Sequence, residues 1–150
     1  MDRLELKQKI LNACMQHQLA VMENLKIVME EAQDSAEEYG LPKDLYDSYR
    51  NQLMSKRDMF AQQLQKANEQ LEILKRVEIT RVHNTIGFGS VVITESQKLF
   101  IATGIGKVTV ERVEYYVISG MVPFFNAIYD KRKGDSFEFR GKKEKILDVF

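Results

Sequence analysis

The sequence predicts an α+β protein in which a long antiparallel helical hairpin is followed by a small sheet domain. Seven of the eight glycines and one of the two prolines lie after residue 76, so residues 1–76 hold only Gly40 and Pro42. The hydrophobic period changes at the same point, from three-to-four residues before it to two residues after it. We therefore expect two domains, a coiled-coil hairpin over 1–76 and a sheet domain over 77–150.

Two long helices are expected in the first domain. The break between them, Gly40–Pro42, combines a glycine helix stop with a proline that suits the first turn of the next helix. Because the connection is short, the second helix should return along the first for roughly 50 Å. The expected seam consists of Leu4, Lys7, Leu11, Cys14, Gln18, Val21, Leu25, Val28, Ala32, Ser35 and Tyr39, facing Leu53, Phe60, Leu64, Ala67, Leu71 and Leu74.

The second domain is expected to be a mostly antiparallel sheet with one short helix. β-Branched and aromatic runs separated by turn residues predict the strands, and Pro123 marks the start of the helix. The expected strands are 90–94, 98–103, 107–110, 114–118, 136–139 and 145–150, and the expected helix is 122–129.

Composition narrows the function classes. The 150 residues are 44% hydrophobic and carry 22 acids and 22 bases, which argues against disorder and against a globally basic nucleic-acid binder. Apolar runs are too short for a membrane span, and the charged start lacks a signal-peptide core. The single cysteine, Cys14, has no partner for an internal disulfide. We expect a cytoplasmic protein without membrane contact.

Enzyme and metal motifs are missing from the sequence. The glycine pairs lack the spacing and the lysine of a phosphate-binding loop, and one cysteine with two histidines does not suffice for a zinc site. We expect His17 and His83 to be structural and Cys14 to pack in the seam. Tyr46 and Tyr49 lie beside Leu53 at helical spacing and are expected in the core rather than as stacking surfaces for bases.

An acid-rich segment surrounds the expected hairpin turn. Residues 30–47 hold seven acids and one base, a net charge of −6. Asp44 lies where the dipole of the second helix favours a carboxylate, whereas Glu37 and Glu38 lie where the dipole of the first helix disfavours one. One interpretation is a solvated helix end, and the other is a site for a metal ion or a cationic surface. The candidate site residues are Glu37, Glu38 and Asp44.

A basic cluster follows the expected short helix. Lys131, Arg132 and Lys133 are followed by Arg140, Lys142, Lys143 and Lys145. These residues either bind an acidic partner or keep a small sheet domain in solution.

The C-terminal residues resemble the Gre family of bacterial transcript-cleavage factors, GreA and GreB. The family pattern runs roughly I-S-x-x-S-P, then a short apolar helix, then G-K-x-x-G-D. Over 118–135 the matching residues are Ile118, Ser119, Pro123, Ala127, Lys131, Gly134 and Asp135, whereas Val122, Phe125 and Asp130 depart from the pattern. The last fourteen residues also resemble the final two strands of the family, and the resemblance spans essentially the whole chain.

The resemblance implies a fold and a function. It implies an FKBP-like second domain that docks on RNA polymerase through Pro123, Phe124, Lys131, Arg132 and Lys133. The coiled coil would enter the secondary channel of the polymerase, where Glu37, Glu38 and Asp44 would help to hold Mg²⁺ and stimulate cleavage of backtracked RNA at its 3′ end. On this interpretation the chain is a monomeric transcription elongation factor, is not itself an enzyme, and binds no cofactor alone.

Two other functions remain open from the sequence. One is a regulator that occupies the secondary channel without catalysis. The other is an FKBP-like prolyl isomerase or chaperone with a dimerising coil, although no aromatic-lined pocket can be identified from the sequence.

Overall fold

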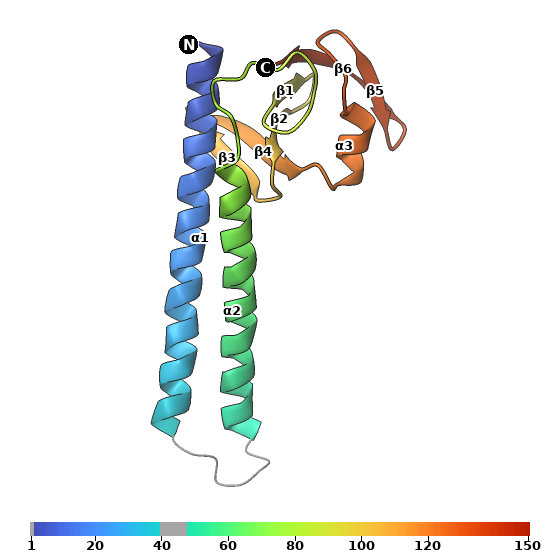
Figure 1. The fold of residues 1–150 in the computed structure, drawn as a ribbon. Helices are drawn as coiled ribbons and strands as arrows, with labels where there is room; N and C mark the ends of the chain where they lie inside the picture. Colours follow the sequence, from blue (N-terminus) through green and yellow to red (C-terminus); the bar gives the residue numbers. More distant parts are fainter. Residues whose placement is uncertain (1, 40–47) are drawn as a thin grey trace. The chain divides into compact units, whose positions relative to one another are not determined.

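The computed structural model describes residues 2–39 and 48–150 (Figure 1). The chain divides into two compact units, of which one is Gln18–Leu71 and the other combines Met1–His17 with Glu72–Phe150. We call them the hairpin unit and the sheet unit and describe each by itself. No helix in the described ranges is both long and apolar enough to cross a membrane.

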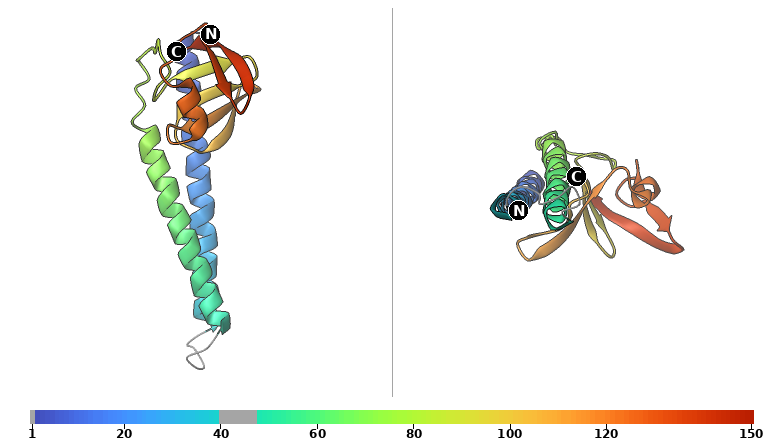
Figure 2. Two further views of the ribbon diagram at one scale, coloured as in Figure 1. Left: turned by 90° about the vertical axis from the view of Figure 1, so that its right-hand side faces the viewer. Right: turned by 90° about the horizontal axis from the view of Figure 1, so that it is seen from below.

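Two antiparallel helices, α1 (Arg3–Tyr39) and α2 (Ser48–Leu74), lie side by side in both long views (Figures 1 and 2). The hairpin unit consists of α1 from Gln18 onward and of α2 up to Leu71. At one end the rings of Tyr39 and Tyr49 meet edge to face at 4.9 Å. Near the other end Gln18 reaches across and donates hydrogen bonds to the carbonyl of Ala67 and the side chain of Gln70. The predicted hairpin is therefore confirmed, and the expected turn at Gly40–Pro42 lies outside the described residues.

The seam of the hairpin unit is thin. Val21, Leu25 and Val28 occupy the predicted stripe but are only half-buried. A pair of helices can cover just one narrow stripe of each partner, so large side chains at its edges stay in contact with water. The fully buried residues of this unit are mostly small: Gln18, Ala32, Ala36, Ala67 and Leu71.

The sheet unit is built on six strands and one short helix (Figure 1). The strand order is β3-β4-β2-β1-β6-β5, and every neighbouring pair is antiparallel except β2 and β4, which are parallel. The sequence predicts the strands but not this parallel pair, because β3 intervenes in the chain and then lies outside β4. The elements are β1 (Val91–Thr94), β2 (Lys98–Ala102), β3 (Gly106–Val110), β4 (Val113–Ser119), α3 (Pro123–Ile128), β5 (Ser136–Phe139) and β6 (Lys142–Val149).

Each face of the sheet packs against a different helical element. On one face Ile10, Leu11 and Cys14 of α1 join Phe100 and Val117 in a single cluster. On the other face α3 supplies Phe125 and Ile128 to a cluster that includes Leu99, Ile101 and Ile146. The fold class expected from the sequence, a helical hairpin followed by a small sheet domain with one short helix, is confirmed.

The compact units do not follow the sequence boundary between residues 76 and 77. That boundary marks the change of hydrophobic period, whereas compactness depends on packing. Because the first turns of α1 bury Ile10, Leu11 and Cys14 against the sheet, residues 1–17 belong to the sheet unit. Burial also raises the pKa of the Cys14 thiol to about 12, as expected for a packed and unreactive cysteine.

Candidate functional site

The acidic candidates lie where α1 ends. Glu37 and Glu38 occupy its last turn and are exposed. Among the described residues, the Gln33 amide donates a hydrogen bond to Glu37 Oε1 at 3.2 Å. Within the described residues neither of them forms an ion pair. Both carboxylates are therefore available to an external cationic group.

These two carboxylates do not converge on one point. Consecutive residues of an α-helix are separated by about 100° around its axis, so Glu37 and Glu38 point in different directions. Across residues 2–39 and 48–150, no group of three histidine, cysteine or acidic side chains is arranged to hold a metal ion. The third candidate, Asp44, lies outside the described residues.

An exposed aromatic residue accompanies the acids. Tyr49 is the second residue of α2 and contacts Tyr39, and 54% of its surface is exposed. Tyr46 lies outside the described residues. The expectation that Tyr49 lies in the core is wrong, because the seam at this end is too narrow to cover a ring that already contacts Tyr39 only by an edge. The end of the hairpin unit thus combines carboxylates with an aromatic surface.

The second group of candidates lies on and after α3. Pro123 is exposed at the first helical position, where its missing N–H leaves no bond unmade. Phe124 is half-buried and meets Phe137 and Phe139 edge to face, at 5.6 and 5.2 Å between ring centroids. Phe125 is buried against Tyr129 and belongs to the core. The predicted partner-binding set includes two residues of this helix, Pro123 and Phe124, and both present apolar surface to solvent.

The basic candidates follow in the connection from α3 to β5. Arg132 and Lys133 are exposed, and Lys131 is half-buried. The Asp135 carboxylate accepts a hydrogen bond from the backbone N–H of Arg132 at 2.9 Å, which fixes the turn, and Asp130 adopts a left-handed φ of 61°. In the described part of the chain none of the three basic side chains has an acidic partner within ion-pair distance.

A hollow lined by aromatic rings adjoins these candidates. Its volume is about 490 Å³, and we call it the aromatic hollow. Sequence patterns do not reveal this hollow, because its walls come from α3, β5, β6 and the β1–β2 turn, which meet only in the folded sheet. Its lining residues are Ser96, Gln97, Phe124, Phe137, Phe139, Arg140, Lys142 and Glu144.

The single carboxylate in the aromatic hollow is already engaged by the protein. Glu144 is buried, and its Oε1 accepts hydrogen bonds from the Ser96 N–H at 2.9 Å and the Thr94 hydroxyl at 3.4 Å. Arg140 instead lies over the Phe139 ring at 5.2 Å, and Lys142 is exposed. The charged lining of the hollow therefore consists of two cations, Arg140 and Lys142, and one carboxylate that is already hydrogen-bonded to the protein.

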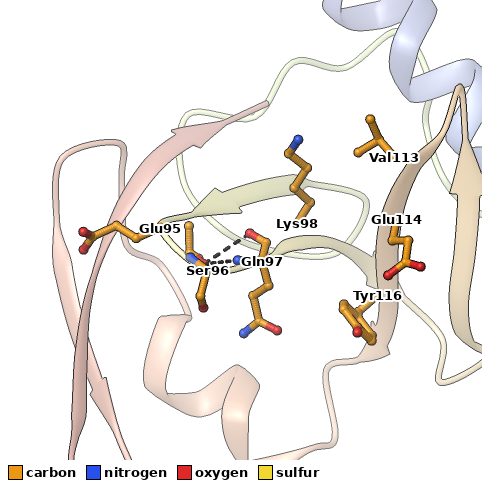
Figure 3. A pocket seen from close by; sticks show the side chains of 8 residues that line it. Glu95, Ser96, Gln97, Lys98, Val113, Glu114 and Tyr116 are labelled. Carbon is orange, nitrogen blue, oxygen red and sulfur yellow. Dashed lines mark hydrogen bonds between the residues drawn. The ribbon is translucent and has the colours of Figure 1, made fainter.

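A second, more polar hollow is also lined by the β1–β2 turn (Figure 3). It encloses about 420 Å³ and shares Ser96 and Gln97 with the aromatic hollow. Figure 3 shows that Tyr116 and Glu114 enter it from β4, opposite the turn. Glu114 is paired with Lys107 at 3.2 Å, and the other two charged lining residues, Glu95 and Lys98, have opposite signs. This hollow has no feature that singles out a ligand class.

A buried Lys7–His83 pair was not anticipated by the sequence. Lys7 is fully buried, and its Nζ lies 3.0 Å from both His83 Nδ1 and the Arg81 carbonyl. Burial, reinforced by the charge of Arg81, lowers the pKa of Lys7 to about 8. Burial and the Lys7 charge also lower the pKa of His83. The enclosed pair connects α1 to the 75–90 connection.

Comparisons with known proteins give no close relative. No family model matches the chain, and no curated protein matches it. Among solved structures, the transcription factor Gfh1 is 21% identical over 91% of this chain and 93% of its own, with a TM-score of 0.34. GreA factor homolog 1 (Gfh1) of Thermus thermophilus is 19% identical over 91% and 94%, and Thermus aquaticus Gfh1 is 21% identical over 92% and 94%, both with a TM-score of 0.34. Matches at this level carry no argument about the function of this chain.

Proposed function

We propose that this chain is a transcription factor that binds RNA polymerase and places its helical hairpin in the secondary channel. The observation that carries the proposal is the Gre-like segment from Ile118 to Asp135. The helix, the left-handed residue and the basic turn that this segment requires are all present, as α3, Asp130 and the 131–135 turn. A hairpin with an acid-rich end is the second element of the same resemblance.

The two surfaces have separate roles in this proposal. Pro123 and Phe124, with Lys131, Arg132 and Lys133, dock the sheet unit on an acidic and partly apolar surface of the polymerase. The part of α1 in the hairpin unit, residues 18–39, is about 33 Å long at about 1.5 Å per residue, so a narrow rod is available to enter a deep channel. Most of the binding free energy then comes from the sheet unit, and the acidic end acts at the polymerase active site.

At the active site the end of the hairpin contributes carboxylates. Mg²⁺ prefers hard oxygen ligands and retains several waters, and when bound in the polymerase it would supply charge stabilisation for hydrolysis. Because the side chains of Glu37 and Glu38 point in different directions, only one of them can contact a given Mg²⁺ ion at a time. Asp44 is the proposed third carboxylate of the set. The chain supplies charge and hydrogen-bond acceptors, and the polymerase supplies the catalytic site.

The divergence of Glu37 and Glu38 also favours a second candidate function. A factor with no converging ligand set can still occupy the channel and block the entry of substrate. We therefore retain a non-catalytic secondary-channel regulator as the alternative. Cleavage stimulation distinguishes the two functions.

The test uses stalled, backtracked polymerase complexes incubated with the purified chain. Stimulated RNA cleavage supports the proposed function, binding without cleavage supports the regulator, and absence of binding rejects both. The variant Glu37→Gln, Glu38→Gln, Asp44→Asn should lose cleavage while keeping its affinity. The matched control Glu30→Gln, Glu31→Gln, Asp34→Asn removes the same charge from α1 farther from its end and should retain cleavage.

A second experiment tests the docking surface. Arg132→Glu with Lys133→Glu should weaken polymerase binding at least tenfold, because the reversal places like charges against an acidic partner. The control Lys107→Glu with Arg112→Glu reverses two exposed bases elsewhere in the sheet unit and should leave the affinity within about twofold. Equal losses in both variants would remove the assigned docking surface.

A further inference from the structure

The connection between α2 and β1 lines a small polar pocket beside the buried Lys7–His83 pair. Its volume is about 100 Å³, and all of its lining residues belong to the sheet unit. We call it the arginine pocket. At roughly 30 Å³ per water it has room for about three waters, so it suits a small ion and is too small to enclose a nucleoside. The lining residues are Arg76, Glu78, Arg81, His83 and Phe88.

The charged side chains of the arginine pocket are not balanced. Arg76 and Arg81 are exposed, and within the described residues neither forms an ion pair. Glu78 supplies the single carboxylate of the lining and lies beyond ion-pair distance of both arginines. The lining therefore presents two guanidinium groups against one carboxylate.

A third positive charge lies behind the pocket wall. Lys7 is fully buried, and its Nζ contacts two neutral groups, His83 Nδ1 and the Arg81 carbonyl, each at 3.0 Å. In the described part of the chain Lys7 has no acidic side chain within ion-pair distance. A buried charge without a counter-charge is costly. Burial and the charge of Arg81 accordingly lower the pKa of Lys7 to about 8, yet at neutral pH the amine is still mainly charged.

His83 separates this charge from the pocket. The Lys7 ammonium can only donate at Nδ1, so the ring accepts there and is neutral, and a hydrogen bond with the Phe88 backbone involves the ring as well. Burial and the charges of Lys7 and Arg81 lower the pKa of His83, which keeps it neutral. His83 thus forms a wall, and Lys7 acts on the pocket through its electric field and not by contact.

An oxyanion in the arginine pocket would compensate all three positive charges at once. Guanidinium groups match the geometry of phosphate and sulfate oxygens, to which they donate paired hydrogen bonds. We propose that the arginine pocket binds a tetrahedral oxyanion, either free phosphate or the terminal phosphate of a nucleotide, through Arg76 and Arg81, with Lys7 as a buried counter-charge. This proposal does not depend on polymerase binding.

Isothermal titration calorimetry of the full chain with sodium sulfate tests the site. The titration is done at pH 7 and at an ionic strength held constant with chloride, because sulfate also stabilises folded proteins without binding to a site. Saturable binding of one sulfate per chain is expected. Arg76→Gln with Arg81→Gln should weaken the affinity at least tenfold, since it removes both donors.

The matched control is Arg112→Gln with Lys143→Gln. It removes the same charge from two exposed positions elsewhere in the sheet unit and should keep the affinity within about twofold. Equal losses in the two double variants would show only a general effect of net charge and would overturn the proposal. Absence of saturable binding to the wild type would overturn it as well.

Glu78→Gln gives a test in the opposite direction. Removing the carboxylate of the lining should strengthen sulfate binding at least twofold, because a like charge then no longer faces the anion. Glu138→Gln removes an exposed carboxylate from β5 and should leave the affinity unchanged. A Glu78→Gln variant that binds sulfate no better than the wild type would contradict an anion in this pocket.

The pH dependence of sulfate binding tests the role of Lys7. Between pH 7 and pH 9 sulfate, Glu78 and both arginines keep their charges and His83 stays neutral, whereas Lys7 loses its charge. The wild-type affinity should therefore fall at least threefold. Lys7→Met, checked for folding by circular dichroism, should bind more weakly at pH 7 and show no such fall. A wild-type affinity that is constant over this range would overturn the counter-charge role, and this measurement needs no variant.

Inorganic phosphate and adenosine monophosphate distinguish the two sources of the anion. Phe88 is 45% exposed and belongs to the lining, so a base outside the pocket could stack on its ring. A nucleotide that binds at least tenfold more tightly than phosphate, with the advantage lost in Phe88→Ser, identifies a terminal phosphate as the ligand. Equal affinities identify free phosphate. If neither binds saturably, the proposal is wrong, whatever the outcome with polymerase.

Discussion

The hairpin unit and the sheet unit bury very different material. The sheet unit encloses large side chains on both faces of one sheet, including Phe100, Ile101 and Ile146, each with at most 1% of its surface exposed. The hairpin unit encloses mainly alanines, together with Gln18 and Leu71, and leaves its larger apolar residues half-exposed. Hydrophobic stabilisation scales with the apolar area removed from water, so most of it resides in the sheet unit.

This difference means that the arrangement of each unit is fixed by a different kind of contact. A six-stranded sheet with a core on each face specifies one arrangement through shape, whereas two paired helices need additional contacts to fix their register. Gln18 provides such a contact through its bonds to Ala67 and Gln70. The hairpin unit is thus the more readily opened part, and substitutions in the two units should have unequal effects.

The largest effect is expected from Phe100→Ala in the sheet unit. Phe100 is fully buried in β2, so truncation should lower the free energy of unfolding by about 3–5 kcal/mol. The matched change in the hairpin unit, Phe60→Ala, removes a half-buried ring and should cost no more than about 2 kcal/mol. Urea denaturation followed by circular dichroism measures both. Equal losses would contradict the contrast between the two units.

A smaller effect is expected from Gln18→Ala. Gln18 is 2% exposed, and its amide joins the two helices at 2.7 and 2.9 Å. Truncation removes both bonds and leaves a small void, which should destabilise the hairpin unit by about 1–3 kcal/mol. Amide hydrogen exchange should show faster exchange in α1 and α2 and little change in β1 and β2. The exposed neighbour Gln16→Ala is the control and should leave exchange unchanged.

Lys7 should make stability rise with pH. Its pKa is about 8 in the folded chain and 10.5 when unperturbed, so between these values the unfolded state binds more protons and unfolding becomes less favourable as pH rises. The neutral amine still donates to the Arg81 carbonyl, so the geometry is kept. The lowered pKa of His83 also makes stability rise with pH, over the range between its pKa in the folded chain and its unperturbed value of 6.5.

The measurement compares denaturation midpoints from pH 8 to about 10 in the wild type and in Lys7→Met. The wild type should gain stability relative to the variant across this range, because methionine does not titrate. Lys66→Met removes an exposed lysine and should keep the wild-type slope. Identical slopes for Lys7→Met and the wild type would show that the ammonium of Lys7 is not held in a desolvated site.

The fold was largely predictable from local pattern. Periodicity located both helices, and β-branched runs separated by turns located all six strands, with β6 beginning earlier than expected, at Lys142. The parallel pairing of β2 with β4 was not predictable, because alternation is the same in parallel and antiparallel neighbours at a half-buried position. The boundary of the sheet unit depends on the packing of Ile10 and Cys14 against strands that are distant in the sequence. A short stretch of sequence does not contain this information.

The candidate site was predictable only in part. The exposure of Glu37, Glu38, Arg132 and Lys133 follows from charge, because unpaired charged residues are rarely buried. Lys7 is the exception, since it is stabilised by His83 and a carbonyl that lie more than 70 residues away. The aromatic hollow likewise depends on residues from four separate elements. Asp44 lies outside the described residues, and its role remains a prediction.

The smallest effect is expected from Glu37→Gln with Glu38→Gln. Both carboxylates are exposed at the C-terminal end of α1, where the helix dipole disfavours negative charge, and within the described residues neither has a cationic partner. Neutralising them should change the free energy of unfolding by no more than about 0.5 kcal/mol, towards greater stability. The control is Arg3→Gln, which breaks the 3.1 Å pair with Asp148 and should shift stability slightly in the other direction. Chemical denaturation at low salt resolves the sign. A clear loss of stability in the double variant would mean that these acids hold the hairpin end together, and their charge at an unfavourable helix end would then need no external partner.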